Sequence, residues 1–287
     1  MPVKVEHVTH TYMQDSPFES TAIRDISLEI EDGEFVGLIG HTGSGKSTLI
    51  QHLNGLLKPT SGTIIVNGLA IVRKSKDLKQ LRQQVGLVFQ YPEHQLFEET
   101  VYQDIAFGPK NLGLSQQEID FRVHEAIELV GLSFEDVRDR SPFEISGGQR
   151  RRVAIAGVLA MKPQVLILDE PTAGLDPRGR DEIFGQIKSL HQKNGLTIIL
   201  VSHSMEDIAR LVDRIIVMNK GGIELTGTPR EVFIHADRLK EMGLGVPQIT
   251  GLMKALKEKG LDVPVDIYTI AQAKEVLIKV LGGKHHA

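Results

Sequence analysis

One segment constrains the fold of this chain more than any other, and it reads Gly40-His41-Thr42-Gly43-Ser44-Gly45-Lys46-Ser47. It fits the phosphate-loop pattern, in which backbone N–H groups point at phosphate oxygens and the following helix adds its dipole. Side chains would block that approach, so the pattern needs glycines. The apolar run 35–39 precedes the loop and an apolar helix start follows it, which is the context that the motif requires. We therefore expect Lys46 to reach the β- and γ-phosphates of a nucleotide and Ser47 to bind Mg²⁺.

Further short apolar runs resemble residues 35–39, and each is predicted to be a buried strand. They occupy residues 85–89, 165–169, 197–201 and 215–218. Helical patterns separate several of them, including residues 116–130, which a Ser115 cap precedes, and residues 179–190. Strands that alternate with helices predict an α/β fold with a largely parallel sheet.

Three regions outside these runs have different patterns. Residues 3–30 read as strands in which apolar and polar residues are interleaved. Residues 101–159 look mostly helical and predict a helical lobe between two strands of the sheet. After about residue 235, glycine and proline break short helical segments.

A carboxylate pair ends one of the predicted strands, Val165-Leu166-Ile167-Leu168-Asp169-Glu170. Ligands bind at the carboxyl ends of strands in α/β folds, so this position suits a catalytic site. We expect Asp169 to hold Mg²⁺ and Glu170 to polarise an attacking water. Without the phosphate loop, an exposed acidic turn would be the better interpretation.

A second glycine-rich segment, Ser146-Gly147-Gly148-Gln149, precedes an apolar helical run. A serine and two glycines at a helix N-terminus can form another anion-binding nest. The same residues also fit a Ser-capped helix after a flexible turn.

Taken together, these motifs resemble those of the ATP-binding cassette (ABC) ATPases, and they occur in that family's order. Additional matches extend the resemblance over residues 1–235: an adenine-stacking Tyr12, a Q-loop Gln90, a D-loop Gly174-Leu175-Asp176 and a switch His203. Ile145 stands before the signature serine, where the family usually has leucine. The two side chains are similar in volume, so we expect little effect.

The resemblance implies a fold and a division of the chain. We expect an α/β ABC nucleotide-binding domain over residues 1–235, with a RecA-like phosphate-loop core, an antiparallel β subdomain and a helical subdomain at about residues 100–160. A small helical C-terminal extension for dimerisation is expected over residues 236–287.

The resemblance also implies which residues do the chemistry. Glu170 and His203 would act in hydrolysis, and Asp176 would form the D-loop. The signature Ser146-Gly147-Gly148-Gln149 would cap the nucleotide of a second cassette packed head to tail. Mg²⁺ would be held by Ser47, Gln90 and Asp169. ATP would contact Tyr12, Gly40, Thr42, Gly43, Ser44, Gly45, Lys46, Ser47, Thr48 and Gln90.

Two of these interpretations leave alternatives open. Tyr12 could be a packing residue, and Phe18 is a rival for the adenine contact. The run Arg150-Arg151-Arg152 could suggest a nucleic-acid patch. Because it follows the signature and enters a helix, we favour a solvated or ion-paired helix face.

Within the ABC ATPases, the chain resembles the ATPase subunits of energy-coupling factor (ECF) transporters, which power uptake of vitamins or of cobalt and nickel ions. The similarity is closest to the second of two paralogous ATPases. It rests on Tyr91-Pro92-Glu93-His94-Gln95-Leu96-Phe97, Asp104 to Leu114, and Ala154 to Met161.

The ECF resemblance implies partners. A second ATPase subunit would complete a heterodimer, beneath a membrane coupling subunit and a substrate-binding membrane subunit. Leu96 and Phe97, flanked by Glu98 and Glu99, would form the groove for the coupling helices. An ordinary loop-to-helix junction is the alternative.

Composition bears on the competing functions. The chain has 33 basic and 37 acidic residues and no cysteine. The acidic balance argues against nucleic acid as a partner and hence against a non-transport ABC ATPase. No apolar run approaches the ~18 residues of a spanning helix, and residues 1–6 lack a secretion signal. Together with these observations, the ECF resemblance implies a peripheral protein at the cytoplasmic face of the membrane. The ATPase of a conventional ABC importer remains an alternative.

The extension 236–287 is too short to form a stable hydrophobic core of its own. Its apolar side chains are therefore expected to find cover elsewhere, on the partner cassette, and they include Leu252, Leu256, Val276, Leu277 and Val280.

Overall fold

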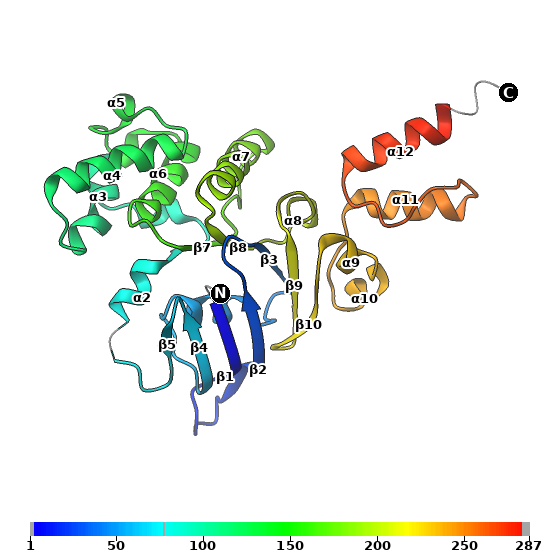
Figure 1. Ribbon diagram of the computed structural model, residues 1–287, viewed down its shortest axis with the longest axis horizontal. Helices are drawn as coiled ribbons and strands as arrows, with labels where there is room; N and C mark the ends of the chain where they lie inside the picture. The colour runs from blue at the N-terminus through cyan, green and yellow to red at the C-terminus, as the bar shows by residue number, and fades with distance from the viewer. Residues whose placement is uncertain (1–2, 77, 283–287) are drawn as a thin grey trace.

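The computed structural model describes residues 3–76 and 78–282 of the chain (Figure 1). Within them, one sheet has the strand order β10-β9-β3-β8-β7-β6. Strands β9, β3, β8, β7 and β6 run parallel, and β10 is antiparallel to β9. The bounds are β3 Phe35–Ile39, β6 Val85–Val88, β7 Val165–Asp169, β8 Thr197–Val201, β9 Arg214–Asn219 and β10 Gly222–Gly227. The predicted α/β fold with a largely parallel sheet is confirmed.

The strand order brings distant segments of the chain to one edge of this sheet. Every residue of β3 and β8 is buried, as expected for strands covered on both faces. In the register, Leu38 of β3 and Asp169 of β7 both pair with Val201, the last residue of β8. The segments that follow β3, β7 and β8 therefore begin next to one another.

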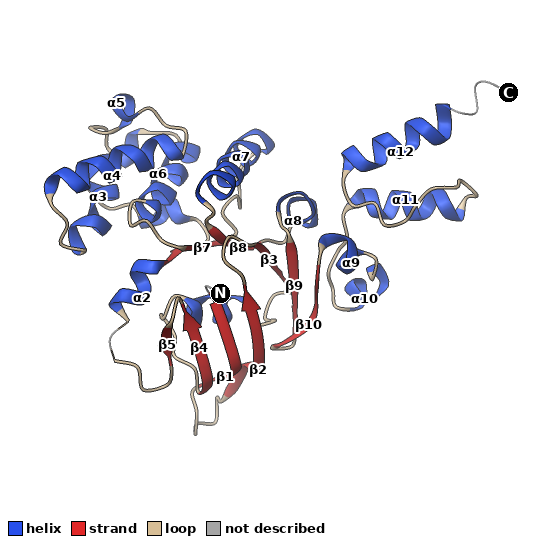
Figure 2. Cartoon of the chain, in the orientation of Figure 1, coloured by secondary structure: helices blue, strands red, loops and turns tan. Residues whose placement is uncertain are grey.

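A second, antiparallel sheet packs beside the first and has the order β2-β1-β4-β5 (Figure 2). One buried cluster includes Val5 and Ile26 of this sheet together with Leu38 and Val201 of the parallel sheet. The bounds are β1 Val3–Tyr12, β2 Ser20–Ile30, β4 Ser61–Val66 and β5 Leu69–Ile71. The antiparallel β subdomain that the family resemblance implied is therefore present.

A group of helices lies to one side of the sheets, between β6 and β7 in the sequence (Figure 1). It comprises α3 (Val101–Asn111), α4 (Gln116–Leu129), α5 (Phe134–Val137) and α6 (Gly147–Leu159). Ser115 caps α4 by accepting a hydrogen bond from the Glu118 backbone, as the sequence predicted. The remaining helices of the core are α1 (Lys46–Leu53), α2 (Lys79–Gln84), α7 (Pro177–Asn194) and α8 (Met205–Leu211).

The chain after β10 forms α9 (Pro229–Phe233), α10 (Ala236–Glu241), α11 (Gln248–Glu258) and α12 (Ile270–Gly282). Leu239 and Leu244 still belong to the main core, whereas Met253, Val263, Ile267 and Ala273 form a separate cluster. The expectation that the extension must find all its cover elsewhere is wrong in part. Leu256, Val276, Leu277 and Val280 pack against this local cluster, because α11 and α12 fold back on each other.

Leu252 on α11 is 47% exposed, and Ile270, Ile278 and Leu281 on α12 are 76%, 62% and 51% exposed. The division of the chain at residue 235 stays a prediction, and both outer ends, residues 1–2 and 283–287, lie outside the described residues. In the described part of the chain, no helix combines the length and the apolar character needed to cross a membrane.

Candidate active site

The phosphate loop joins β3 to α1 and is tightly held by its neighbours. Gly45 caps α1 with a φ of 101°, a conformation that favours glycine, and a Cβ there would lie 2.7 Å from the Ala22 carbonyl oxygen. A Cβ at Gly40 would lie 2.4 Å from Ser44 Oγ. Thr42, Gly43 and Ser47 are exposed on the outer side of the loop. The two glycines therefore let the loop pack closely on one side while its other side stays open.

Lys46 is buried beneath the loop. Its Nζ donates hydrogen bonds to the carbonyl oxygens of Gly40 at 2.6 Å and of His41 at 3.0 Å. Burial lowers the pKa of Lys46, and the nearby carboxylates of Glu170 and Asp169 only partly oppose this. The ammonium group thus lies between the phosphate loop and the acidic pair.

Asp169 and Glu170 lie at the end of β7, at the edge of the sheet where the phosphate loop begins. Burial raises the pKa of Asp169, and Lys46 opposes that change. Glu170 has a φ of 49°, and its N–H donates to the Val201 carbonyl oxygen at 3.0 Å. This left-handed turn is uncommon for a residue other than glycine, and it directs the chain away from the sheet immediately after Asp169.

The Glu170 carboxylate has the most perturbed environment in the site. Its Oε1 is buried and accepts no hydrogen bond from the described residues. Burial, followed by repulsion from Asp169, raises the pKa of Glu170 to about 7. A carboxylate with a pKa near neutrality can accept a proton from a reacting water, as a general base must.

His203 follows β8 and faces Glu170. Its Nε2 lies 3.6 Å from Glu170 Oε1, and its side chain is 57% exposed. Burial, and then the charge of Lys46, lower the pKa of His203. Lys46, Asp169, Glu170 and His203 are therefore brought together at one sheet edge, and the roles that the sequence suggests for them stay predictions.

Tyr12 ends β1 and lies against the helix that follows the phosphate loop. Its hydroxyl is 3.2 Å from Thr48 Oγ1, and its ring packs edge-on against His10 at 4.5 Å between centroids. Behind it, the buried His52 donates from Nδ1 to the Thr48 carbonyl oxygen at 2.6 Å. Tyr12 is thus held by Thr48 and a histidine pair, and it is still 39% exposed. Phe18 lies in the β1–β2 loop and is 78% exposed.

Gln90 is exposed after β6, which is next to β7 in the sheet. Asp176 follows β7 in the sequence and is also exposed. It caps α7, since its Oδ1 accepts a hydrogen bond from the Gly179 N–H at 2.7 Å. Both predicted residues therefore lie in segments that leave the core sheet near the carboxylate pair.

The signature segment lies elsewhere, at the start of α6 in the helical group (Figure 1). Ser146 and Gln149 form a capping box: Gln149 N donates to Ser146 Oγ at 3.3 Å, and Ser146 N donates to Gln149 Oε1 at 3.0 Å. Ser146 and Gly147 are exposed, whereas the Ile145 side chain is buried in the core, where an apolar residue was expected. The Ser-capped helix is thus present, and Gly147 is exposed at its start.

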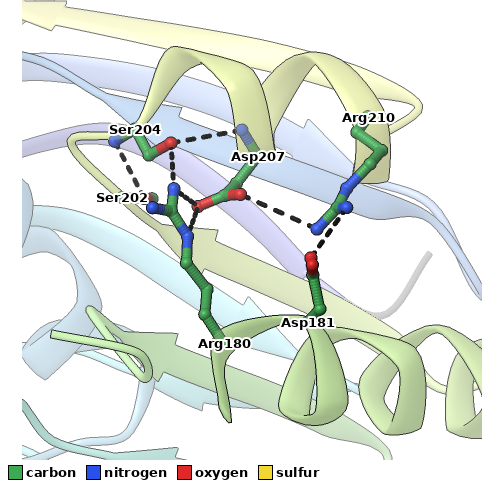
Figure 3. Close-up of polar contacts among 6 residues, drawn as sticks. All are labelled: Arg180, Asp181, Ser202, Ser204, Asp207 and Arg210. Carbon is green, nitrogen blue, oxygen red and sulfur yellow. Dashed lines mark hydrogen bonds and ion pairs between the residues drawn. The ribbon is translucent and has the colours of Figure 1, made fainter. Parts of the chain in front are cut away.

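Sequence reasoning missed the partners of two arginines. Arg151 was expected on a solvated or ion-paired helix face, and it is ion-paired, with Glu93, although its side chain is buried at 2% exposed. Arg180 binds Ser204 and Asp207 (Figure 3), and Ser204 directly follows His203 in the sequence. Their partners are many residues away in the sequence, and no spacing pattern signals such pairs.

Comparison with known proteins agrees with this geometry. Residues 23–173 match the family model of the ABC transporter. The chain is 61% identical to the energy-coupling factor transporter ATP-binding protein EcfA2 of Clostridium tetani over 99% of both chains. It is 61% identical to the EcfA2 of Caldanaerobacter subterraneus subsp. tengcongensis, again over 99% of both. The chain belongs to the ATP-binding subunits of ECF transporters, within the ABC transporter family.

Solved structures share the fold of this ECF ATPase. CbiO1 of Clostridium perfringens, part of the ABC transporter complex cbiONQ, aligns with a TM-score of 0.75 and 40% identity, over 88% of this chain and 98% of that one. The ATP-binding cassette MJ0796, in a dimeric post-hydrolysis state with ADP and Pi, aligns with a TM-score of 0.70 and 30% identity, over 79% and 98%. The predicted ABC fold and the ATP-hydrolysing transport role of the ECF ATPase are therefore confirmed.

Proposed function

We propose that this ECF ATPase binds Mg²⁺–ATP on the phosphate loop and hydrolyses it with Glu170 as the general base. The observation that carries the proposal is the meeting of Lys46, Asp169, Glu170 and His203 at one sheet edge, with the pKa of Glu170 raised to about 7. Loop N–H groups and Lys46 would hold the phosphates, and Tyr12 would stack on adenine.

The donor set beside the loop suits Mg²⁺. Ser47 and Gln90 are exposed and offer a hydroxyl and an amide oxygen, and Asp169 offers a carboxylate. Mg²⁺ prefers such oxygen ligands and is commonly bound by one or two protein groups together with substrate phosphates. When bound, the ion would neutralise charge on the phosphate oxygens. His203 would contact the γ-phosphate, since it faces Glu170 from the neighbouring strand.

A second cassette would complete each site. The exposed signature residues Ser146 and Gly147 stand at the start of α6, in the helical group. In a head-to-tail dimer they would cap the nucleotide held by the partner, with Gly148 and Gln149 behind them and Asp176 near the interface. The relative MJ0796 is dimeric with ADP and Pi. Similarity to EcfA2, the second paralogue, favours a heterodimer for this chain.

The membrane partners would dock beside Gln90. Leu96 is buried, but Phe97 and Phe107 are 60% and 45% exposed and pack edge-on at 5.1 Å. Exposed aromatic side chains next to Glu98 and Glu99 suit the amphipathic, cationic helices of a coupling subunit. A substrate-binding subunit would complete the importer for vitamins or transition-metal ions, with the ATPase peripheral at the cytoplasmic face. The relative CbiO1 is part of the complex cbiONQ.

The C-terminal extension, residues 236–287, would help hold the dimer. Its exposed apolar side chains Leu252, Ile278 and Leu281 offer a surface to the partner cassette. Deletion of the chain from residue 248 onward is expected to weaken association of the two ATPases, as measured by analytical ultracentrifugation. Unchanged dimerisation would contradict this role.

Affinity purification of the tagged chain from native membranes tests the proposed assembly. The expected result is co-purification of a second cassette and a polytopic coupling protein in stoichiometric amounts. A Phe97→Asp variant should lose the coupling protein and keep the second cassette. Recovery with ribosomes or DNA, or with an extracellular binding-protein system, would contradict the proposal.

A further inference from the structure

Two ionic contacts join α7 to α8, and they differ in what lies beside them (Figure 3). In the first, the Arg180 guanidinium binds both Ser204 Oγ and Asp207 Oδ2, with an Nε–Oδ2 distance of 2.8 Å. In the second, Arg210 Nη1 donates to Asp181 Oδ1 at 2.9 Å, and Arg210 Nη2 also lies 3.8 Å from Asp207 Oδ1 within α8, so the control substitution is made at Asp181 and leaves both arginines in place. The first contact lies at the start of α8, where His203 precedes the helix, and the second lies toward its end.

The first contact holds the chain directly next to His203. Ser204 caps α8, and its Oγ accepts from the Asp207 N–H at 3.3 Å. The Ser204 N–H donates to Ser202 Oγ at 3.1 Å, so both neighbours of His203 belong to the same hydrogen-bonded network. The Asp207 side chain is 6% exposed, and such a buried carboxylate needs a cationic partner. The network therefore fixes the backbone from which the His203 side chain projects.

The other end of the contact is anchored near the D-loop. The backbone N–H of Arg180 donates to the Asp176 carbonyl oxygen at 3.0 Å, within the first turn of α7. Asp176 in turn caps that helix. The Arg180 side chain thus spans from the helix that Asp176 starts to the helix that His203 precedes.

We propose that Arg180 is a positioning residue, which fixes His203 opposite Glu170 by holding Ser204 and Asp207. This inference rests on the proposed role of His203 in hydrolysis. Arginine suits the task because its planar fork binds the hydroxyl and the carboxylate together. A lysine at this position would bind one of them at a time.

The Arg210–Asp181 pair offers a matched control. It joins the same two helices, but its side chains are 48% and 65% exposed, and such pairs contribute little to stability. If Arg180 only fastened α7 to α8, loss of either contact would have a similar effect on turnover. If Arg180 positions His203, only its own loss would reduce turnover.

The test compares Arg180→Gln, Arg180→Lys, Asp181→Asn, His203→Ala and the double variant Arg180→Gln/His203→Ala, each in the full chain assembled with its wild-type partner complex. The readouts are kcat and KM for ATP, nucleotide affinity and Tm. Arg180→Gln is expected to lower kcat by about 10- to 100-fold, as small misplacements of a catalytic group do, with KM and nucleotide affinity within about twofold of wild type. Arg180→Lys should lower kcat to an intermediate degree at a wild-type Tm, and Asp181→Asn should leave kcat unchanged.

The double variant distinguishes positioning from loosening of the fold. If Arg180 acts through His203, Arg180→Gln should change kcat by less than about twofold in the His203→Ala background, because the two losses are not additive. Should Arg180→Gln fail to fold, Arg180→Lys carries the same comparison. Two results would overturn the role of Arg180 and leave the role of His203 standing. One is an equal kcat in Arg180→Lys and Asp181→Asn; the other is a kcat of the double variant reduced by the product of the two single losses. Wild-type hydrolysis by His203→Ala would overturn the proposed role of His203 together with it.

Discussion

Arg151, in the signature helix α6, binds both carboxylate oxygens of Glu93, which lies three residues after Gln90 in the sequence. The two distances are 2.9 Å from Nε and 2.5 Å from Nη2. The same guanidinium donates to the carbonyl oxygens of Ala173 at 2.6 Å and Pro171 at 3.3 Å. One buried side chain thus connects the signature helix, the segment after Gln90 and the segment after Glu170.

Removal of Arg151 from this contact is predicted to destabilise the fold strongly. Burial alone would raise the pKa of Glu93, but the hydrogen bonds from Arg151, a backbone hydrogen bond and the charge of Arg151 together hold that pKa below its ordinary value. Replacement by Arg151→Met leaves Glu93 and two carbonyl oxygens without their partner, and it should reduce the free energy of unfolding by about 3–5 kcal/mol. Chemical denaturation measures the change.

Arg138→Ala is the control for that experiment. Arg138 pairs with Asp139 at 3.0 Å, but the two side chains are 40% and 83% exposed. Loss of this pair should reduce the free energy of unfolding by no more than about 1 kcal/mol. An effect of Arg151→Met as small as that of Arg138→Ala would show that the Glu93 contact contributes little.

The raised pKa of Glu170 predicts a pH-dependent stability in metal-free, nucleotide-free protein. Because the folded-state pKa is about 7 and the ordinary value is 4.5, folding favours the protonated carboxyl. This stabilisation is complete below pH 4.5 and is lost as the pH rises through 7. Glu170→Gln stays neutral at every pH. Its free energy of unfolding should therefore exceed that of wild type by on the order of 3 kcal/mol at pH 8, and the difference should become small near pH 4.5. Thermal denaturation in EDTA tests this, and an equal difference at both pH values would argue against a perturbed Glu170.

The head-to-tail arrangement predicts an effect across the dimer. Ser146→Arg places a bulky cation where the signature would cap the partner's nucleotide, so hydrolysis in the assembled complex should fall on the order of tenfold or more. The substitution also removes a helix cap, which alone costs about 1 kcal/mol of stability. Ser115→Arg is the matched control, since Ser115 is an exposed cap of α4 in the same helical group. Equal ATPase rates in the two complexes would count against the dimer model.

Local sequence patterns predicted the parts of the fold that local physics determines. Residues 35–39 and 197–201 are strands with the expected bounds, because continuous apolar runs of that length suit a sheet covered on both faces. The predicted helix at 179–190 is longer in the structure and begins at Pro177, because Asp176 caps it. The role of Asp176 as a cap was not anticipated, although Asp-Pro is a known helix start.

Long-range pairs were beyond sequence reasoning. The partners Arg151 and Glu93 are 58 residues apart, and nothing in the spacing of either distinguishes a buried ion pair from a solvated face. The small cluster around Met253 was missed for a related reason: α11 and α12 cover each other only after the chain reverses direction at residues 259–269. The sheet-edge residues were predicted because each follows a recognisable strand.

The hydrolysis rate of Glu170→Gln tests the central claim most directly. Lys46, Asp169 and the phosphate loop are intact in this variant, so ATP affinity should stay within about twofold of wild type. Loss of the general base should reduce single-turnover hydrolysis by on the order of 10²-fold or more. Hydrolysis within about twofold of the wild-type rate, with ATP bound normally, would contradict the assignment of this sheet edge as the centre of ATP hydrolysis.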